Sequence, residues 1–199
     1  MKIAVFASGR GSNLQAIIAA STRGDIPAEI ELVISDNKDA RALKRAEAAG
    51  IDNIFVDPGE FNFNREYEEK LIEILKGYEI DLIALAGYMR ILSTLFIKEY
   101  RNKIVNIHPS LLPAFKGLNA QQQALDYGVK YSGCTVHYVD AGVDSGPIID
   151  QAVVRVDDND TVEDLAQRIL KEEHRIYPEV IKDIVEGKVI IKNRKVIKN

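Results

Sequence analysis

Short runs of branched apolar residues alternate with longer amphipathic stretches through the first half of this chain. Such alternation is typical of parallel β-strands joined by crossover helices. The apolar runs predict strands at Lys2–Ala7, Glu31–Ser35, Asn53–Val56, Leu82–Ala86 and Ile104–Ile107. Helical spacing of apolar residues predicts helices at Asn13–Ala20, Ala40–Ala49 and Arg65–Lys76, with Gly50 and Gly77 at helix C-caps.

The apolar residues of the first four predicted strands fall on both strand faces, so helices are expected to cover both sides of the sheet. The predicted fold class is therefore α/β, with a single-domain, doubly wound, mostly parallel sheet. Ligands of such sheets bind at the C-terminal ends of the strands. We therefore expect the functional residues to lie where these strands end.

The pattern changes after about residue 130. Cys134–Asp140 and Pro147–Val156 are consecutive extended runs, and only the Gly- and Asp-rich loop Ala141–Gly146 separates them. Two extended runs with a short connection are expected to pair as hairpin-like neighbours. The sequence therefore predicts an antiparallel edge on the mostly parallel sheet.

The C-terminal part of the chain predicts one long helix and a small hairpin. The helix is expected to begin at Thr161, where Glu163-Asp164 suits a positively polarised helix start, and to run to about Val185 with a possible irregularity at Pro178. The basic, alternating tail Lys188–Lys198 is interpreted as a solvated hairpin that turns at Asn193-Arg194, in preference to a nucleic-acid patch.

Length and composition indicate one domain over residues 1–199, because 46% hydrophobic residues suffice for one sizeable core. The formal net charge of -4 argues against nucleic acid as a partner. The single cysteine, Cys134, fits a reducing compartment and is given no chemistry. The N-terminal apolar run is short for a signal peptide, and no stretch of about 20 apolar residues follows. We expect a cytoplasmic protein without a membrane partner.

A glycine-containing loop follows the first predicted strand. Gly9 and Gly11 lie between this strand and a helix, where backbone N–H groups and the helix dipole can bind a phosphate. Ser12 and Asn13 add polar donors. The sequence favours a phosphate ligand here.

Two alternatives compete with that interpretation of the loop. A nicotinamide dinucleotide is one, because Asp36 ends the second predicted strand where a ribose-binding acid would lie. However, Leu14 occupies the position of the third glycine of a dinucleotide loop, and its side chain would push helix and strand apart. The other alternative is a strand-to-helix turn without a ligand.

A strand-end asparagine and histidine are the strongest candidates for chemistry. Side chains alternate along a strand, so Asn106 and His108 point to the same side and could contact one ligand. Pro109 stops the strand, which places His108 where doubly wound sheets bind ligands. A lone histidine is more often structural, but its position here favours function. The loop Asp140–Pro147, taken by itself, is interpreted as an ordinary turn.

Several stretches together resemble the 10-formyltetrahydrofolate-dependent formyltransferases. They are Asn106–Pro113, Gly133-x-Thr135-x-His137 and Asp144-x-Gly146-Pro147-Ile148-Ile149. The loop Gly11-Ser12-Asn13 and two further stretches, Ala86–Leu92 and Glu173-His174-x-x-Tyr177-Pro178, are similar to the branch of that family that formylates a small phosphorylated amine in purine biosynthesis. The resemblance covers nearly the whole chain.

The resemblance implies ligands and residue roles. The co-substrate would be 10-formyltetrahydrofolate, without a metal, and the partners would be small molecules, with the protein a monomer or a homodimer. Gly11, Ser12 and Asn13 would hold the substrate phosphate, and Glu173 would hold the ribose hydroxyls. The folate pocket would include Arg65, Met89, Arg90, Ile91, Leu92 and Asn106.

Acyl transfer to an amine gives the three central residues, Asn106, His108 and Asp144, distinct tasks. Asn106 can donate a hydrogen bond to the developing oxyanion. A protonated His108 can stabilise that charge and act as a general acid. The resemblance places Asp144 beside His108, where a carboxylate would raise the imidazole pKa and could order a proton-carrying water. His137 is expected to face the sheet or to support the site, and His174 to lie beside Glu173 on a helix.

One position departs from the family pattern. After Lys116-Gly117-Leu118 the family usually has a histidine, and this chain has Asn119. An amide can form hydrogen bonds but carries no charge, so a proton-transfer role at this position is in doubt.

Three rival functions remain open. A formyltransferase for methionyl-tRNA would be expected to carry an extra C-terminal domain and a basic surface, and a formyl-folate hydrolase an N-terminal regulatory domain. The net charge of -4 and the single domain expected over this length disfavour the first rival, and the start of the first predicted strand at Lys2 disfavours the second. The third rival is a folate-binding protein with no turnover.

Overall fold

The computed structural model describes residues 1–198. The chain divides into two compact units, residues 1–105 and the residues from 106 onward, and each is described separately. The single domain expected over the whole chain stays a prediction. No helix within residues 1–198 is long and apolar enough to cross a membrane.

The first unit contains four parallel strands, β1 to β4, in the order β3-β2-β1-β4. Their bounds are β1 Lys2–Phe6, β2 Glu29–Ser35, β3 Asp52–Phe55 and β4 Leu82–Leu85. The chain first moves outward from β1 to β3 and then returns to place β4 on the other side of β1. This reversal is a topological switch point, and loops beyond the carboxyl ends of β1 and β4 form a natural ligand crevice.

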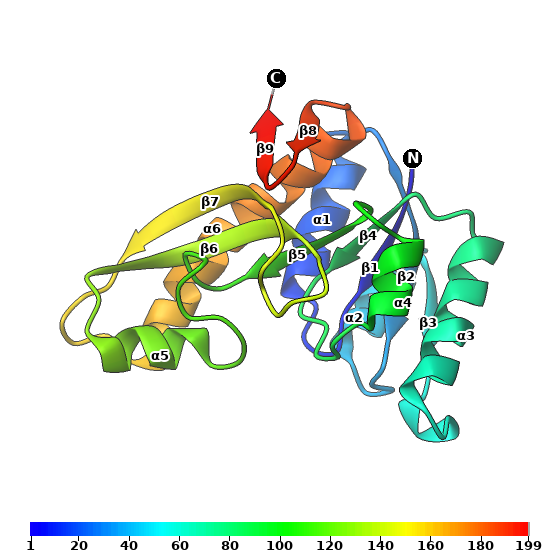
Figure 1. The fold of residues 1–199 in the computed structure, drawn as a ribbon, viewed down its shortest axis with the longest axis horizontal. Coiled ribbons are helices and arrows are strands. Elements are labelled where there is room, and N and C mark those ends of the chain that lie inside the picture. Colours follow the sequence, from blue (N-terminus) through cyan, green and yellow to red (C-terminus); the bar gives the residue numbers. More distant parts are fainter. Residues whose placement is uncertain (199) are drawn as a thin grey trace. The chain divides into compact units, whose positions relative to one another are not determined.

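Helices α1, α2 and α3 and the short 3₁₀ helix η1 connect these strands, and α4 follows β4 (Figure 1). Right-handed crossovers in opposite directions place α1 and α2 on one face of the sheet and α3 and α4 on the other. Their bounds are α1 Ser12–Thr22, α2 Arg41–Ala48, η1 Pro58–Glu60, α3 Asn64–Gly77 and α4 Thr94–Glu99. The first three predicted helices correspond to α1, α2 and α3, whereas α4 and η1 are too short to give a periodic signal.

Two expectations for this unit were wrong in detail. Strand β3 is mostly exposed, not covered on both faces, because it lies at the end of the strand order. Gly50 takes the left-handed conformation expected after α2, with φ of 69°. Gly77 instead is the last residue of α3, and Glu79 takes the left-handed conformation, with φ of 56°.

The second unit begins within strand β5 and is dominated by an antiparallel strand pair and a long helix. Its elements are β5 Ile104–His108, α5 Ala120–Tyr127, β6 Tyr131–Tyr138, β7 Ile148–Arg155, α6 Val162–Val185, β8 Val189–Lys192 and β9 Lys195–Lys198. Strands β6 and β7 pair antiparallel, as predicted. The predicted class, α/β with mostly parallel strands and an antiparallel edge, is therefore confirmed.

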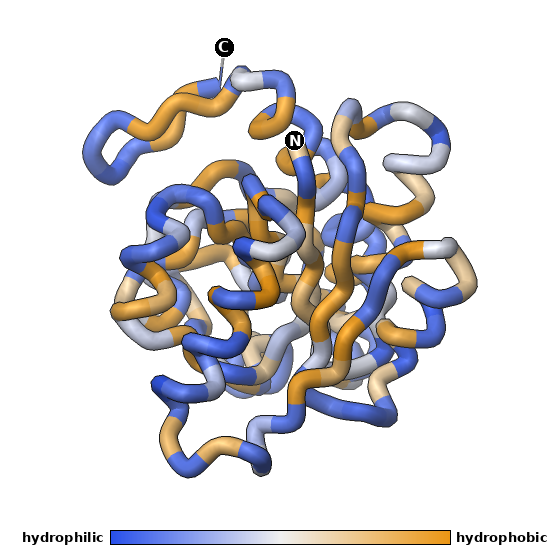
Figure 2. Tube along the Cα trace, turned by 90° about the vertical axis from the view of Figure 1, so that its right-hand side faces the viewer, coloured by the Kyte–Doolittle hydropathy of each residue, from blue (hydrophilic) through white to orange (hydrophobic). Residues whose placement is uncertain are grey.

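Helix α6 begins and packs as its sequence predicts. The Thr161 side chain accepts from the Asp164 N–H, and the Asp164 carboxylate accepts from the Thr161 N–H, which makes a capping box. The helix packs on β6 and β7 with an apolar face that includes Leu165 and Ile169, both fully buried. It continues through Pro178 to Val185. Figure 2 shows hydrophobic residues concentrated along the strands and hydrophilic residues at the turns.

The C-terminal hairpin forms as predicted but is not merely solvated. Strands β8 and β9 pair around a turn in which Asn193 has φ of 58°. The hairpin contacts β7, and the Lys198 ammonium pairs with Asp150 at 2.5 Å and with Asp183 at 3.2 Å. Figure 1 shows β8 and β9 beyond the end of α6. The tail is therefore anchored to the second unit.

Gly11 is required by helix packing as well as by backbone conformation. It is the N-cap of α1 with φ of 67°, and an added Cβ would lie 2.8 Å from Ala42 Cα and 2.9 Å from Ala42 Cβ. Gly24 has φ of 79° with no atom within 4 Å of such a Cβ. Alanine substitutions at these two glycines therefore distinguish the cost of backbone strain alone from the cost of strain together with a steric clash.

We predict that Gly11→Ala destabilises the protein by about 3 kcal/mol or more, because left-handed strain of about 1–2 kcal/mol adds to a clash with the α2 backbone. Gly24→Ala is expected to cost about 1 kcal/mol, from strain alone. Urea unfolding of both variants measures these costs. Equal losses would contradict the packing role of Gly11.

Candidate functional site

Ser8 joins the carboxyl ends of three strands in the first unit. Its N–H donates to the Gly87 carbonyl at 3.1 Å, and its hydroxyl oxygen accepts from the Met89 N–H at 2.9 Å. Its carbonyl accepts from the Asn37 side-chain amide at 3.1 Å. Because these partners follow β4 and β2, Ser8 holds the segment after β4 beside the loop after β1. No sequence signal singled out Ser8 for this role.

The predicted phosphate loop, Gly11 to Asn13, forms the start of α1. Gly11 has no side chain that could cap the helix, so the first N–H groups and the positive end of the helix dipole suit an anion. Ser12 is half-buried and Asn13 is buried, so the Asn13 side chain is less available than the sequence suggested. Arg45 Nε donates to the Arg10 carbonyl at 2.9 Å and fixes the loop before the helix.

The predicted folate-lining residues Met89 to Leu92 differ from one another in exposure. Met89 and Ile91 are 66% and 75% exposed, which is unusual for apolar side chains, whereas Leu92 is buried. The Arg90 guanidinium lies 4.9 Å from the centre of the Tyr67 ring and donates to Asn64 at 3.1 Å. The segment thus presents two apolar side chains from a backbone that is fixed at both ends.

Glu68 fixes the far end of that segment and was not found from the sequence. Its buried carboxylate accepts from the Ser93 N–H at 2.6 Å, from the Ser93 hydroxyl and from the Asn64 amide at 3.2 Å. The available signal was its position, because Glu68 shares the apolar face of α3 with Leu71 and Leu75. A carboxylate on a buried helix face needs such donors.

Arg65 has a simpler environment. It lies on α3 and pairs with Glu69, one helical turn away, at 2.7 Å. Its side chain is 74% exposed. This geometry is that of a solvated helix ion pair, and nothing in it singles out a ligand contact.

His108, at the end of β5, is buried between two hydrogen-bond acceptors in the second unit. Its Nε2 lies 2.8 Å from the Phe115 carbonyl oxygen, and its Nδ1 lies 3.3 Å from Asp144 Oδ2. Only the doubly protonated ring donates to both. Burial nevertheless lowers the His108 pKa below 6.5, although Phe115 and Asp144 both act to raise it. Asp144 thus acts on the His108 pKa in the expected direction, but burial, which no local pattern reports, outweighs it.

Asp144 lies within a loop that holds its carboxylate against several partners. Its backbone is left-handed, with φ of 45°, and Oδ2 accepts from the Gly117 N–H at 2.8 Å. Oδ1 lies 3.7 Å from His137 Nε2. Burial by itself would raise the Asp144 pKa, but the interactions with His137, Gly117 and His108 together hold it below its ordinary value. Asp144 therefore stays ionised at neutral pH.

Asn106 is oriented by His137, which was expected to face the sheet or to support the site. His137 Nδ1 lies 2.8 Å from the Tyr138 carbonyl oxygen, which can only accept, so Nδ1 carries a proton. In the neutral ring, Nε2 then accepts from the Asn106 amide nitrogen at 3.2 Å. That amide has two N–H groups, so one is left to donate elsewhere. Asn106 and His108 are thus linked through His137 and Asp144.

Thr135 on β6 holds the chain that follows His108. Its hydroxyl donates to the Ser110 carbonyl at 2.6 Å and accepts from the Leu112 N–H at 3.0 Å. The Gln151 amide donates both to Thr135 Oγ1 at 2.9 Å and to the Leu112 carbonyl at 3.0 Å. The Thr135 position in the motif was noted from the sequence, but its partners were not.

Two further predicted positions lie elsewhere in the second unit. Asn119 is exposed at the start of α5 with φ of 56°, a left-handed conformation that asparagine tolerates better than most residues. Glu173 is buried on α6, 7% exposed. Burial, with the Glu173 charge as a smaller cause, raises the pKa of the Cys134 thiol to about 12, so this thiol is unreactive. Within residues 1–198, no cluster of His, Cys, Asp and Glu is arranged to hold a metal ion.

An oriented amide donor next to a buried imidazole–carboxylate pair can stabilise an oxyanion and move a proton, which are the needs of acyl transfer. Residues 1–181 match the formyl transferase family model, and the chain belongs to that family. Formyltransferases of this family use a formyl-folate co-substrate.

Named relatives are similar in sequence to this chain over most of its length. It is 46% identical over 184 residues to phosphoribosylglycinamide formyltransferase of Bacillus subtilis (strain 168). The matched residues cover 92% of this chain and 94% of that protein. The chain is 47% identical over 193 residues to trifunctional purine biosynthetic protein adenosine-3 of Drosophila melanogaster, covering 96% of this chain and 14% of that protein. The crystal structure of glycinamide ribonucleotide transformylase 1 from Symbiobacterium toebii superimposes with a TM-score of 0.98 at 52% identity, covering 100% and 93% of the two chains.

The balance of burial and charge at His108 gives a titration test. We predict that His108 titrates below 6.5 and that Asp144→Asn lowers its pKa further, because the Asp144 charge raises that pKa. Long-range ¹H–¹⁵N NMR on a chain with 3 histidines resolves the titration. Asp158→Asn, which removes an exposed carboxylate paired with Lys130, is the control and should leave it unchanged. A rise of the His108 pKa in Asp144→Asn would contradict this electrostatic account.

Proposed function

We propose that this protein transfers the formyl group of 10-formyltetrahydrofolate to the amine of glycinamide ribonucleotide, giving formylglycinamide ribonucleotide and tetrahydrofolate in purine biosynthesis. The observation that carries the proposal is the 46% identity to a phosphoribosylglycinamide formyltransferase over almost the full length of both chains. The cluster of Asn106, His137, Asp144 and His108 supplies groups that suit this reaction. We infer a cytoplasmic enzyme, and its state as a monomer or homodimer stays a prediction.

We assign substrate binding to residues of each unit separately, within one formyltransferase domain over residues 1–199. In the first unit, the N–H groups at Gly11, Ser12 and Asn13 bind the substrate phosphate through the α1 helix start. In the second unit, the buried Glu173 carboxylate accepts hydrogen bonds from the ribose hydroxyls. A carboxylate oxygen is a strong hydrogen-bond acceptor, and the burial of Glu173 supports a specific polar contact at this position.

We assign the folate pocket of the first unit to Met89, Arg90, Ile91 and Leu92. The exposed Met89 and Ile91 side chains offer apolar surface to a planar ring system. The links from Ser8 to Met89 and from Glu68 to Ser93 hold this segment in place before the ligand binds. Arg65 remains the weakest member of the set, because its partner is Glu69.

The proposed reaction begins when the neutral amine attacks the formyl carbon and the carbonyl oxygen gains negative charge. The free N–H of the Asn106 amide donates to this oxyanion, and the bond to His137 keeps the amide in the required orientation. The bond between the formyl carbon and the folate nitrogen then breaks. That nitrogen leaves with a proton, so the amine proton must be carried across.

His108 and Asp144 carry this proton in the proposal. A lowered pKa leaves the His108 ring mostly neutral at rest. Because Nε2 and Nδ1 lie against Phe115 and Asp144, the proton of the attacking amine reaches the unprotonated nitrogen through a water that Asp144 orders. The resulting imidazolium donates to both Phe115 and Asp144, which stabilises it. His108 then returns the proton to the leaving nitrogen, and Asp144 orders a water on the path. No external acid is needed, because the proton that the amine loses is the proton that the folate nitrogen gains.

The proposed activity is tested by incubating the protein with 10-formyltetrahydrofolate and glycinamide ribonucleotide and following loss of the formyl-folate. Turnover that needs both compounds is expected. Reaction with water alone would assign a formyl-folate hydrolase, reaction with methionyl-tRNA would assign the RNA-directed enzyme, and binding without product would assign a folate-binding protein. Any of these three results would overturn the substrate assignment.

In the same assay, His108→Asn and Asp144→Asn are each expected to lower kcat by about 10²–10⁴, the range typical of general acid–base groups. KM values and the circular dichroism spectrum should change little, because Asp144→Asn keeps the size of the side chain and His108→Asn keeps a polar group at that position. Asp158→Asn is the matched surface control and should retain wild-type kcat. Near-normal turnover in both site variants would remove His108 and Asp144 from the mechanism.

A further inference from the structure

The loop between β6 and β7 holds Asp144 in a left-handed backbone conformation, which aspartate tolerates better than most residues but which still costs free energy. The φ of 45° is left-handed, and residues with a side chain disfavour this region. Within the loop, Asp140 Oδ1 accepts from the Gly142 N–H at 3.1 Å and from the Ser145 hydroxyl at 2.5 Å. These bonds shape the loop tip but tie it to nothing outside the loop.

Gly146 fixes one end of the loop by close packing. A Cβ at this position would lie 1.8 Å from the Tyr138 carbonyl oxygen, so the backbone approaches β6 in a way that only glycine allows. On the other side, the Asp144 carboxylate reaches the Gly117 N–H. The backbone carbonyl of Ser145, between these two anchors, has a partner from a distant part of the chain.

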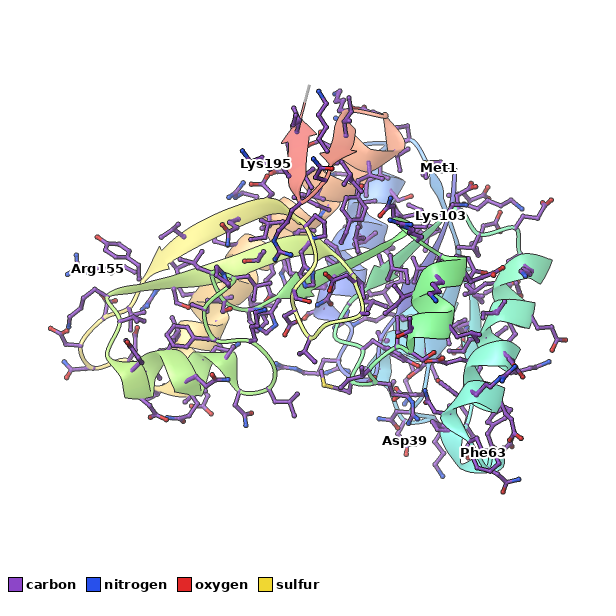
Figure 3. The ribbon with its side chains drawn as sticks, viewed as in Figure 1. Met1, Asp39, Phe63, Lys103, Arg155 and Lys195 are labelled. Carbon is purple, nitrogen blue, oxygen red and sulfur yellow. The ribbon has the colours of Figure 1, made fainter. Side chains whose placement is uncertain are left out.

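That partner is Arg194, in the turn of the C-terminal hairpin. Its Nη2 donates to the Ser145 carbonyl at 2.8 Å, across 49 residues of sequence. A recess of about 340 Å³ lies beside this bond, lined by Gly146, Ile148 and hairpin residues 194–197. Figure 3 labels Lys195, the next residue, at the start of β9. The hairpin turn therefore lies directly against the loop that carries Asp144.

The hairpin can brace the loop because its own base is anchored. Lys198 pairs with Asp150 on β7 at 2.5 Å and with Asp183 near the end of α6 at 3.2 Å. These are two elements of the second unit's core. Arg194 thus extends from a backbone that is already held in place, so only its own side-chain rotamers are restricted when it binds the carbonyl.

We infer that Arg194 is a positioning residue that holds the Ser145 carbonyl and so keeps Asp144 on the Gly117 N–H and beside His108 and His137. The hairpin lies beyond residue 181, where the match to the formyl transferase family model ends. Its catalytic consequence rests on the proposed function, whereas its effect on the loop does not. Without this bond the Ser145 carbonyl is free and the loop opens more often.

The test compares Arg194→Met, Arg194→Lys and the neighbouring control Lys195→Met. The readout is hydrogen exchange of the Gly117 amide by NMR, because this N–H is protected only while Asp144 accepts from it. Arg194→Met is expected to speed Gly117 exchange about tenfold, with amides of α6 unchanged, as for a local opening. Arg194→Lys should recover part of the protection, since one ammonium donor can reach the carbonyl. Lys195→Met should leave exchange unchanged.

Steady-state kinetics provide the second readout. Arg194→Met is expected to lower kcat about threefold to tenfold with unchanged KM values, because loop positioning affects the transition state more than substrate binding. Lys198→Met, which releases the base of the hairpin, should act in the same direction and serves if Arg194→Met folds poorly. Unchanged Gly117 exchange in Arg194→Met, or equal acceleration in Lys195→Met, would overturn the inference. An inactive wild-type protein would refute the proposed function but not the role of Arg194, because the exchange rate of the Gly117 amide tests that role without any activity.

Discussion

The second unit depends on one carboxylate that serves several donors. Asp144 accepts from the Gly117 N–H and lies 3.3 Å from His108 Nδ1, and its other oxygen lies 3.7 Å from His137 Nε2, so one carboxylate adjoins both imidazoles. A half-buried charge such as that of Asp144 is stabilised by such partners. This arrangement requires a left-handed backbone conformation at Asp144, and contacts of the surrounding loop hold the residue in that conformation.

The same carboxylate connects the other parts of the proposed chemistry. His137 orients the Asn106 amide for an oxyanion, and His108 lies between two acceptors that become fully satisfied only when its ring is protonated. Burial resists that protonation, so the balance between burial and the Asp144 charge sets when His108 holds a proton. In the first unit, by contrast, the proposed phosphate site depends on the backbone conformation at the start of α1. Gly11 permits this conformation because a side chain there would collide with Ala42.

Local pattern predicted much of this molecule because it reports on short-range structure. Strand alternation placed Asn106 and His108 on one side of β5, and the Thr161 cap and the turn at Asn193 lie where the residues indicated. The features that the sequence did not predict depend on residues that are far apart along the chain. The bond from Arg194 to Ser145, the pairing of Glu68 with Ser93 and the lowered His108 pKa depend on contacts and burial that no local pattern encodes.

The central claim is that Asp144 acts through His108, and a double-mutant cycle on kcat tests it most directly. If the two residues form one unit, His108→Asn combined with Asp144→Asn should be at most about threefold slower than His108→Asn alone, because most of the effect of Asp144 on turnover passes through His108. Losses that multiply, so that the double variant is slower by the product of the single effects, would contradict the account.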